Sequence, residues 1–361
     1  MAQLNDSIVA SFKTLKKAAS FSDIHFGKRA NSEQHLQDCI DFVNWVKDQV
    51  SNDPSIDHII MMGDWHEHRA GLSTITMHYS YQAAEILSSI DVPVFILIGN
   101  HDLFHRQTRS VFSTLMFKHI PNIYLISEPI TIEMANGPVL LTPFLFPDEY
   151  PGLMEYSKVP VWWGHFEFKG FVISGYNIKM QTGPEHSDFN GPTRIFSGHF
   201  HKRQIEDNIV YIGNTFPMDF SDAGDYERGM AVYEYATDKL QFVDWANCPK
   251  FIRIKLSNLI EGKFTLPTNS RVKCVIDVPL TYEELLDIKK NLSADYNLRE
   301  IILEESDDTD EALENTEVDD TMQSGESHGL DSMVINMLQN IDTPKIDQNL
   351  LVTIYSKLNI E

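Results

Sequence analysis

Five short clusters in the sequence combine carboxylate, amide and imidazole side chains, the groups that bind divalent cations and move protons. They are Asp23-Ile24-His25, Gly63-Asp64 with His66, Glu67 and His68, Gly99-Asn100-His101-Asp102, Gly164-His165, and Gly198-His199-Phe200-His201. A single histidine at a strand end is most often a surface or hydrogen-bonded residue. Here all five clusters follow an apolar run, and most have an adjacent glycine that lets the backbone turn tightly. This shared context indicates one site.

The donor types and their spacing indicate metal-assisted phosphoryl chemistry. Oxygen and imidazole donors without thiolate suit Mn²⁺, Fe or Zn, and two such ions ~3.5–4 Å apart form a clamp for phosphoryl transfer. Alternate residues of an extended segment point to one side, so Asp23 and His25 can reach the same ion, as can His199 and His201. Other chemistries have weaker support, because the sequence contains no GxSxG, no GxxxxGK[ST] and no cysteine in a polar cluster.

Short apolar runs at residues 18–21, 58–62 and 92–98 each predict a buried strand. Between them, residues 31–50 and 76–90 carry apolar side chains at helical spacing. The first helix is expected to have Asn31 as its N-cap, with Gln34 completing a capping box. The order β-α-β-α-β predicts a sheet with crossover helices, and ligands of such sheets bind beyond the carboxyl ends of the strands. The polar clusters lie at that edge.

The pattern changes in the second half of the chain. Residues 121–245 are strand-rich, and residues 250–305 predict a small β-α-β-like module whose helix opens at Thr281, with Glu284 three residues later. Residues 304–328 are too acidic and polar to bury the apolar surface that ordering requires. The expected divisions are residues 1–248, a capping domain at 249–303, a disordered linker at 304–328 and a helical partner-binding tail at 329–361.

The composition is that of an ordinary folded protein, with 42% hydrophobic and 22% charged residues. Its 29 Lys and Arg against 52 Asp and Glu give a formal charge of -23, which argues against nucleic-acid binding through a broad basic surface. A phosphate-bearing partner must therefore be held locally. Three cysteines without CxxC spacing, and the lack of an apolar run approaching ~18 residues, predict a soluble protein of a reducing, intracellular compartment.

The ordered set DIH, GDWHEH, GNHD, GH and GHFH resembles the calcineurin-like metallophosphoesterase superfamily over roughly residues 15–245. The following segment, NIVYIGNTFPMDFSDAGDYERGMAVYEY, and the small module behind it are similar to the SbcD family of DNA double-strand-break repair nucleases. Within that family the chain looks most like the recombination endonuclease subunits of tailed bacteriophages. The resemblance implies an α/β protein with a four-layer α/β/β/α fold, a small α/β capping domain and a C-terminal helical tail. It also implies Mn²⁺-dependent hydrolysis of DNA phosphodiester bonds with two Mn²⁺ ions, Mg²⁺ being the alternative.

The same resemblance implies a role for each matching residue. One metal ion would be bound by Asp23, His25, Asp64 and His201, and the second by Asp64, Asn100, His165 and His199. The non-ligand catalytic histidine would be His101, oriented by Asp102. The chain departs from the family at Glu67, where these nucleases usually carry a histidine, and His66 and His68 are alternative substitutes.

The implied partners are DNA, both as double-stranded ends and as single strands, an SbcC-type coiled-coil ATPase and a second copy of the nuclease. The implied location is the cytoplasm, which is that of the bacterial host if the chain comes from a phage. Two alternatives remain open: another phosphoesterase, such as a phosphoprotein phosphatase or a cyclic-nucleotide phosphodiesterase, and a DNA-end-binding scaffold whose metal is structural. An intact His101 argues against the scaffold.

Two sets of residues near the clusters have both a functional and a structural interpretation. Aromatic residues beside the fourth cluster could stack on bases, but such residues more often belong to the core: Trp162, Trp163, Phe166 and Phe168. Four cations border the proposed site and could hold flanking phosphates or lie on plain solvated loops: Lys28, Arg29, Lys202 and Arg203.

Overall fold

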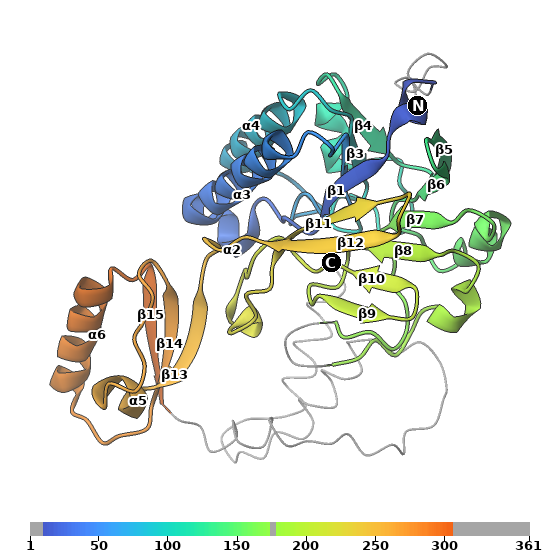
Figure 1. The fold of residues 1–361 in the computed structure, drawn as a ribbon. Helices are drawn as coiled ribbons and strands as arrows, with labels where there is room; N and C mark the ends of the chain where they lie inside the picture. The colour runs from blue at the N-terminus through green and yellow to red at the C-terminus, as the bar shows by residue number, and fades with distance from the viewer. Residues whose placement is uncertain (1–9, 174–177, 306–361) are drawn as a thin grey trace, which may run out of the picture. The chain divides into compact units, whose positions relative to one another are not determined.

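The computed structural model describes residues 10–173 and 178–305 (Figure 1). The described residues belong to one compact unit, Met1–Ser306. The predicted tail and nearly all of the predicted acidic linker lie outside the described residues. Within the described ranges, no helix combines the length and the apolar character needed to cross a membrane.

The first of two large sheets carries three of the five polar clusters. It has six strands in the order β12-β11-β1-β2-β3-β4. Strands β1 to β4 run parallel, and β11 and β12 continue the sheet antiparallel beyond β1. Their bounds are β1 Lys17–Phe21, β2 His58–Met61, β3 Val94–Leu97, β4 Ile123–Ile126, β11 Gly229–Glu234 and β12 Lys239–Asp244. The crossover helices are α3 (Glu33–Asn52) and α4 (Thr74–Ser88).

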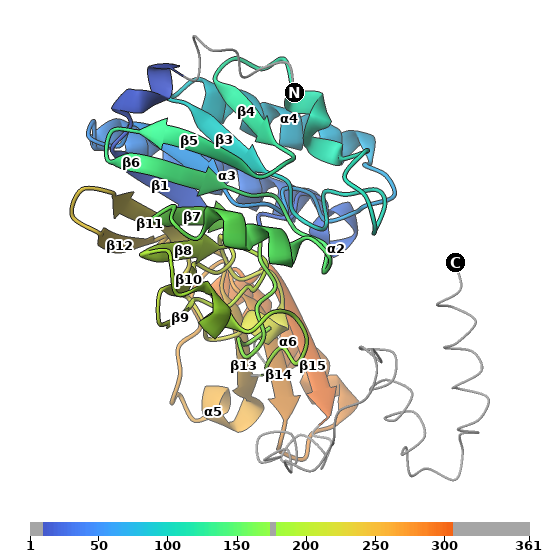
Figure 2. The same ribbon diagram turned by 90° about the vertical axis from the view of Figure 1, so that its right-hand side faces the viewer.

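The second sheet carries the other two clusters, and it lies against the first (Figures 1 and 2). Its six strands have the order β5-β6-β7-β8-β10-β9. They are β5 Ile130–Met134, β6 Gly137–Leu141, β7 Val161–Gly164, β8 Arg194–Ser197, β9 Gln204–Glu206 and β10 Ile209–Tyr211. The remaining short helices of this part are α2 Lys28–Asn31 and the 3-10 helices η1 Phe12–Thr14, η2 Ser113–Phe117, η3 Tyr150–Tyr156, η4 His186–Phe189 and η5 Phe220–Asp222.

Alternation along the strands builds three apolar layers between four structural layers. In β3, Phe95 faces the space between the two sheets, whereas Ile96 packs under α3 and α4. In β7, Trp163 joins the inter-sheet core and Trp162 packs on the outer face, where Leu153 of η3 covers it. The predicted four-layer α/β/β/α fold is confirmed, and 3-10 helices supply part of its outer layer.

The aromatic residues beside the fourth cluster belong to the core. Trp162, Trp163, Phe166 and Phe168 have no solvent exposure. Since none of them reaches the surface, stacking on bases is not available to them.

The first crossover helix begins differently from the prediction. Its N-cap is Ser32, and the Asn31 backbone is left-handed with φ 61°. The Asn31 amide oxygen instead accepts hydrogen bonds from Ser73 and Thr76 at the start of α4. The amide of Gln34 accepts from Arg271 at 2.6 Å. The predicted capping box is therefore wrong, because tertiary partners occupy both side chains.

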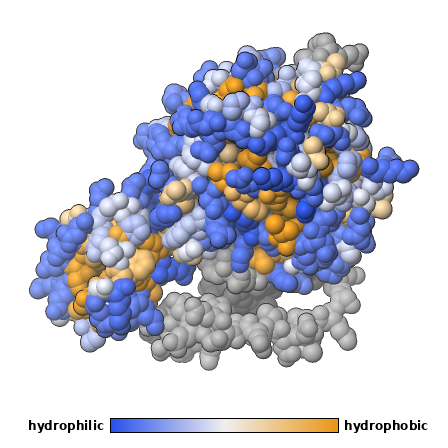
Figure 3. Space-filling model, viewed as in Figure 1, coloured by the Kyte–Doolittle hydropathy of each residue, from blue (hydrophilic) through white to orange (hydrophobic). Residues whose placement is uncertain are grey.

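A third, smaller sheet follows the two large ones. It is parallel in the order β13-β14-β15, formed by β13 Phe251–Lys255, β14 Arg271–Ile276 and β15 Glu300–Glu305. Helix α6 (Tyr282–Tyr296) begins with the predicted capping box of Thr281 and Glu284, and α5 spans Leu256–Ile260. Apolar side chains are visible on this part in Figure 3. Its exposed large apolar residues are Ile260, Phe264 and Leu286.

Candidate metal centre

Backbone pairing continues past the ends of β1 and β2 and places the first two clusters side by side. Asp23 N donates to Gly63 O at 3.0 Å, and His25 N donates to Asp64 O at 3.1 Å. Phe26 N then donates to Trp65 O at 2.8 Å. The parallel register of the sheet therefore aligns residues 23–26 with residues 63–66, and both carboxylates reach the same edge.

The first donor set joins residues from both ends of the catalytic region. His25 Nε2 lies 3.1 Å from His201 Nε2, although the two residues are separated by 176 positions in the chain. The same His25 nitrogen lies 3.9 Å from Asp23 Oδ1 and 3.9 Å from Asp64 Oδ2. These four side chains are the set predicted for the first ion, and the structure brings them together.

The second donor set shares Asp64 with the first. His165 Nε2 lies 3.4 Å from Asp64 Oδ2 and 2.9 Å from Asn100 Oδ1. His199 Nδ1 lies 3.0 Å from the same amide oxygen. The structure therefore also brings together the four side chains predicted for the second ion, with Asp64 between the sets.

The two sets fit divalent cations by the chemistry of their donors. Asp23, His25 and His201 have ligand atoms within 4.8 Å of one another, and so do Asp64, His165 and His199. Imidazole nitrogens and carboxylate oxygens at such spacing suit Mn²⁺, Fe²⁺ or Zn²⁺. A cation between these atoms would stabilise lone pairs that otherwise face one another.

The amide of Asn100 has two orientations with different partners. With its oxygen toward the second set, it offers a further oxygen donor to a cation. With the amide turned over, its nitrogen donates to His165, His199 and Asp64, and its oxygen accepts from Arg69 Nη2 at 3.0 Å. In either orientation, Asn100 separates the donor set from the guanidinium of Arg69.

Burial and mutual charge shift the acid–base properties of the second set. Burial opposes a charge on His165, but the Asp64 carboxylate outweighs it and raises the pKa of His165 to about 9. Burial also opposes ionisation of Asp64, yet His165 holds the pKa of that carboxyl well below its usual range. Burial, together with the charge of His165, lowers the pKa of His199 to about 3. The buried Asp64 carboxylate thus favours a positive charge within the second donor set.

His101 lies beside the first set and is oriented by a backbone group. The backbone N–H of His101 donates to Asp64 Oδ1 at 2.8 Å, and the ring Nδ1 lies 2.9 Å from Glu67 O. A ring nitrogen that donates to a carbonyl leaves Nε2 as the reactive atom.

The predicted orientation of His101 by Asp102 is wrong. The Asp102 carboxylate accepts from the backbone N–H groups of Gly99, Trp65 and His66, and burial raises its pKa to about 7. These hydrogen bonds join the second and third loops, and the carboxylate is used for them instead of for His101.

The second cluster places its three polar residues in different surroundings. Glu67 Oε2 lies 2.8 Å from His25 Nδ1, so this carboxylate contacts the first donor set. His66 is fully buried between Ser80 and Ser113, with both ring nitrogens 2.7 Å from a hydroxyl oxygen, and burial lowers its pKa to about 3. His68 is exposed. Of the three, only Glu67 has its side chain in contact with the donor residues.

Carboxylates pair with cations that were predicted to border the site. Lys28 pairs with Glu67 at 3.6 Å, Arg29 with Glu300 at 2.7 Å and Arg203 with Asp244 at 2.8 Å. A fifth cation, Arg69, was not singled out by the sequence pattern, although it follows Asp64 in the same loop. Arg69 is half-buried, and burial lowers its pKa. Among the described residues, no carboxylate lies within 4.0 Å of its guanidinium.

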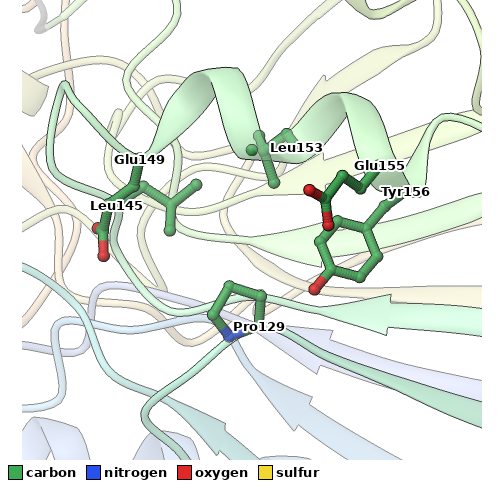
Figure 4. A pocket seen from close by; sticks show the side chains of 7 residues that line it. Pro129, Leu145, Glu149, Leu153, Glu155 and Tyr156 are labelled. Atoms are coloured by element: carbon green, nitrogen blue, oxygen red, sulfur yellow. The ribbon is translucent and has the colours of Figure 1, made fainter.

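A separate cavity of about 170 Å³ lies beside η3 (Figure 4). Its lining residues are Pro129, Leu145, Glu149, Gly152, Leu153, Glu155 and Tyr156, none of which belongs to the donor sets. Glu149 in its wall pairs with Arg109, which also donates to the carbonyl oxygens of Ser127 and Phe144. The charged wall of this cavity therefore has a structural explanation.

Comparison with known proteins agrees with the arrangement of the site. Residues 17–203, more than half of the chain, match the family model described as calcineurin-like phosphoesterase. The chain is also similar to the exonuclease subunit 1 of Enterobacteria phage T4, with 24% identity over 231 residues that cover 63% of this chain and 67% of that protein. Members of this family use divalent metals, and the two sets sharing Asp64 could hold them. The chain belongs to the calcineurin-like phosphoesterase family.

Proposed function

We propose that this protein is the nuclease subunit of a DNA recombination and repair complex and hydrolyses DNA phosphodiester bonds with two Mn²⁺ ions. The observation that carries the proposal is the pair of donor sets meeting at Asp64. In this assignment Asp23, His25, Asp64 and His201 hold the first ion, and Asp64, Asn100, His165 and His199 hold the second. The similarity to a phage exonuclease subunit supports DNA as the substrate.

The chemistry divides between the ions and the protein. When bound, two divalent ions stabilise negative charge on phosphoryl oxygens and lower the pKa of water. His101, held through Nδ1 by the Glu67 carbonyl, presents Nε2 to stabilise the transition state or to protonate the leaving oxygen. Arg69 supplies a guanidinium beside Asn100 that can bind a phosphate oxygen. Such local cations are needed in a chain with a formal charge of -23.

The proposed complex contains an SbcC-type coiled-coil ATPase and two copies of this chain, acts on double-stranded ends and single strands, and works in the host cytoplasm. The word "subunit" in the name of the T4 relative supports a partner. Because an acidic nuclease subunit attracts DNA poorly, an ATPase partner would supply much of the DNA binding.

The decisive experiment is a nuclease assay with Mn²⁺ or Mg²⁺ on duplex and single-stranded DNA, with and without the ATPase. We expect hydrolysis in Mn²⁺, and we expect His101→Ala to lower the rate by ~10²–10⁴-fold while both ions stay bound. Loss of metal from this variant would show that His101 is a ligand. Phosphopeptides and cyclic nucleotides serve as comparison substrates, and faster turnover of either would replace the nuclease assignment. A wild type that binds DNA without hydrolysing any of these substrates would favour the scaffold alternative.

A further inference from the structure

Glu67 stands where similar nucleases carry a histidine, and the backbone fixes it against the loop that contains His25. Glu67 N donates to Phe26 O at 3.0 Å, which continues the pairing between the first two loops. The Glu67 side chain is 20% exposed, and its Oε2 lies 2.8 Å from His25 Nδ1. Both atoms are buried, and within residues 10–173 and 178–305 neither has a hydrogen-bond partner, so this 2.8 Å ion-pair contact is the polar contact that each of them makes. The carboxylate and the ring therefore depend on each other.

The other nitrogen of the same ring points into the first donor set. His25 Nε2 lies 3.1 Å from His201 Nε2 and 3.9 Å from Asp64 Oδ2. A neutral imidazole binds a cation through one nitrogen and carries its proton on the other. An acceptor at Nδ1 therefore determines that Nε2 is the nitrogen available to a cation.

His165 shows the same arrangement in the second donor set. Its Nδ1 lies 2.6 Å from Met62 O, and its Nε2 faces Asp64 at 3.4 Å. The acceptor there is a neutral carbonyl, whereas His25 has a carboxylate. A charged acceptor makes the stronger hydrogen bond and raises the basicity of the ligating nitrogen more.

Lys28 holds the other oxygen of the Glu67 carboxylate. Its Nζ lies 3.6 Å from Oε1, and its side chain is 18% exposed. With one oxygen beside His25 and the other beside Lys28, the carboxylate has a defined orientation.

From these contacts we infer that Glu67 is a positioning residue, which keeps the proton of His25 on Nδ1 and directs Nε2 to the first metal ion. The inference rests on the metal centre of the proposed function. It differs from a second interpretation in which Glu67, His25 and His101, whose ligand atoms lie within 4.8 Å of one another, hold a further ion.

A Mn²⁺ titration of the full chain, followed by the electron paramagnetic resonance signal of free Mn²⁺, separates the interpretations. We expect Glu67→Ala to lower the affinity for one of the two Mn²⁺ ions by about 10–100-fold and to leave the affinity for the other unchanged. Glu67→Gln keeps the shape and an acceptor oxygen but loses the charge, so its loss of Mn²⁺ affinity is expected to be smaller than that of Glu67→Ala. The matched control is Asp57→Asn, which alters another carboxylate next to a buried imidazole, 2.7 Å from His58 Nδ1 and outside both donor sets. This control is expected to leave both affinities unchanged.

Three results would overturn the inference. They are unchanged affinities in Glu67→Ala, an equal loss in Asp57→Asn, and three bound ions in the wild type with two in Glu67→Ala. The last result would make Glu67 a ligand.

Nitrogen-15 spectra of the histidine rings in the metal-free chain at alkaline pH test the tautomer without any bound ion. The wild type is expected to carry the His25 proton on Nδ1, and Glu67→Ala is expected to populate both tautomers. Should the wild type bind no Mn²⁺, the proposed function fails on its own, and these spectra still decide the role of Glu67. Identical spectra for the two proteins would contradict the inference.

Discussion

At the scale of single residues, four donors of the candidate metal centre have backbone conformations that are energetically unfavourable for residues other than glycine. Asp23, His25, Asp64 and His199 have positive φ values of 54°, 52°, 56° and 86°. For residues other than glycine, sparsely populated conformations cost about 1–3 kcal/mol each and persist only where the surroundings impose them. Hydrogen bonds between separate loops do so here: His199 N, for example, donates to the Asp23 carboxylate at 3.1 Å. The fold gives up local stability to turn these donors toward one another.

Asp64 is expected to be the residue on which both ions depend. Because its carboxylate lies between the two donor sets, Asp64→Ala should lose both ions and reduce hydrolysis to background. Asn100→Ala removes a donor from the second set only, so it should mainly lower the affinity for one ion. Metal content of the purified variants, measured by mass spectrometry, checks this. Two ions per chain in Asp64→Ala would contradict the shared role.

The buried histidine His35 predicts a pH dependence of stability. Its Nε2 lies 3.0 Å from His25 O, and burial lowers its pKa from 6.5 to about 3. Between these values the unfolded chain binds a proton that the folded chain does not. The free energy of unfolding should therefore fall as the pH falls through this range, by about 1.4 kcal/mol per pH unit for one histidine.

Denaturant unfolding at several pH values measures this slope. We expect His35→Gln to reduce the slope of unfolding free energy against pH by the contribution of about one proton. Equal slopes in the wild type and His35→Gln would show that His35 does not contribute.

At the scale of elements, glycines at strand ends allow neighbouring loops to approach. A Cβ at Gly99 would overlap the backbone nitrogen and the carboxylate of Asp64. A Cβ at Gly198 would overlap Ser22 Oγ and crowd Met62 O. Both positions exclude any side chain, so the loops after β3 and β8 can lie directly against the loops after β2 and β1.

Gly99→Ala is expected to displace Asp64 and to weaken metal binding. Overpacking of this kind costs about 1–3 kcal/mol in stability. Gly152→Ala is the control, because its added Cβ would have no neighbour within 4 Å. Thermal unfolding and metal content measure both effects. Wild-type stability and two bound ions in Gly99→Ala would show that the loop can move aside.

At the scale of the whole molecule, the small sheet is tied to the catalytic region by charged groups. Arg299 donates to both oxygens of Asp38 on α3 at 2.7 Å. Arg29 pairs with Glu300 at the start of β15. The residue before Arg29 is Lys28, which contacts Glu67. The small sheet and the candidate metal centre are therefore connected through one short segment, residues 28–29.

The tail is expected to bind the ATPase. Residues 333–341 and 350–358 carry two apolar faces on segments too short to be stable alone, and an acidic stretch precedes them. Deleting residues 329–361 should leave the nuclease activity intact and abolish co-purification with the ATPase. Replacing residues 307–328 with a neutral linker of equal length should preserve the complex. If the truncated chain still binds with unchanged affinity, the capping domain becomes the next candidate for docking.

The sequence by itself determined where the strands end and which donors follow them, because hydrophobic periodicity and glycine positions are local properties. The five clusters at strand ends indicated one site, and the family resemblance that they carry implied the four-layer fold and the residues that meet at the candidate centre. Only the tertiary structure decided which groups orient those residues. Asp102 binds backbone N–H groups instead of His101, Glu67 contacts His25, and Asn31 accepts from α4 instead of capping α3. Such partners come from separate loops, and the choice among them depends on burial and close packing that no spacing in the chain encodes.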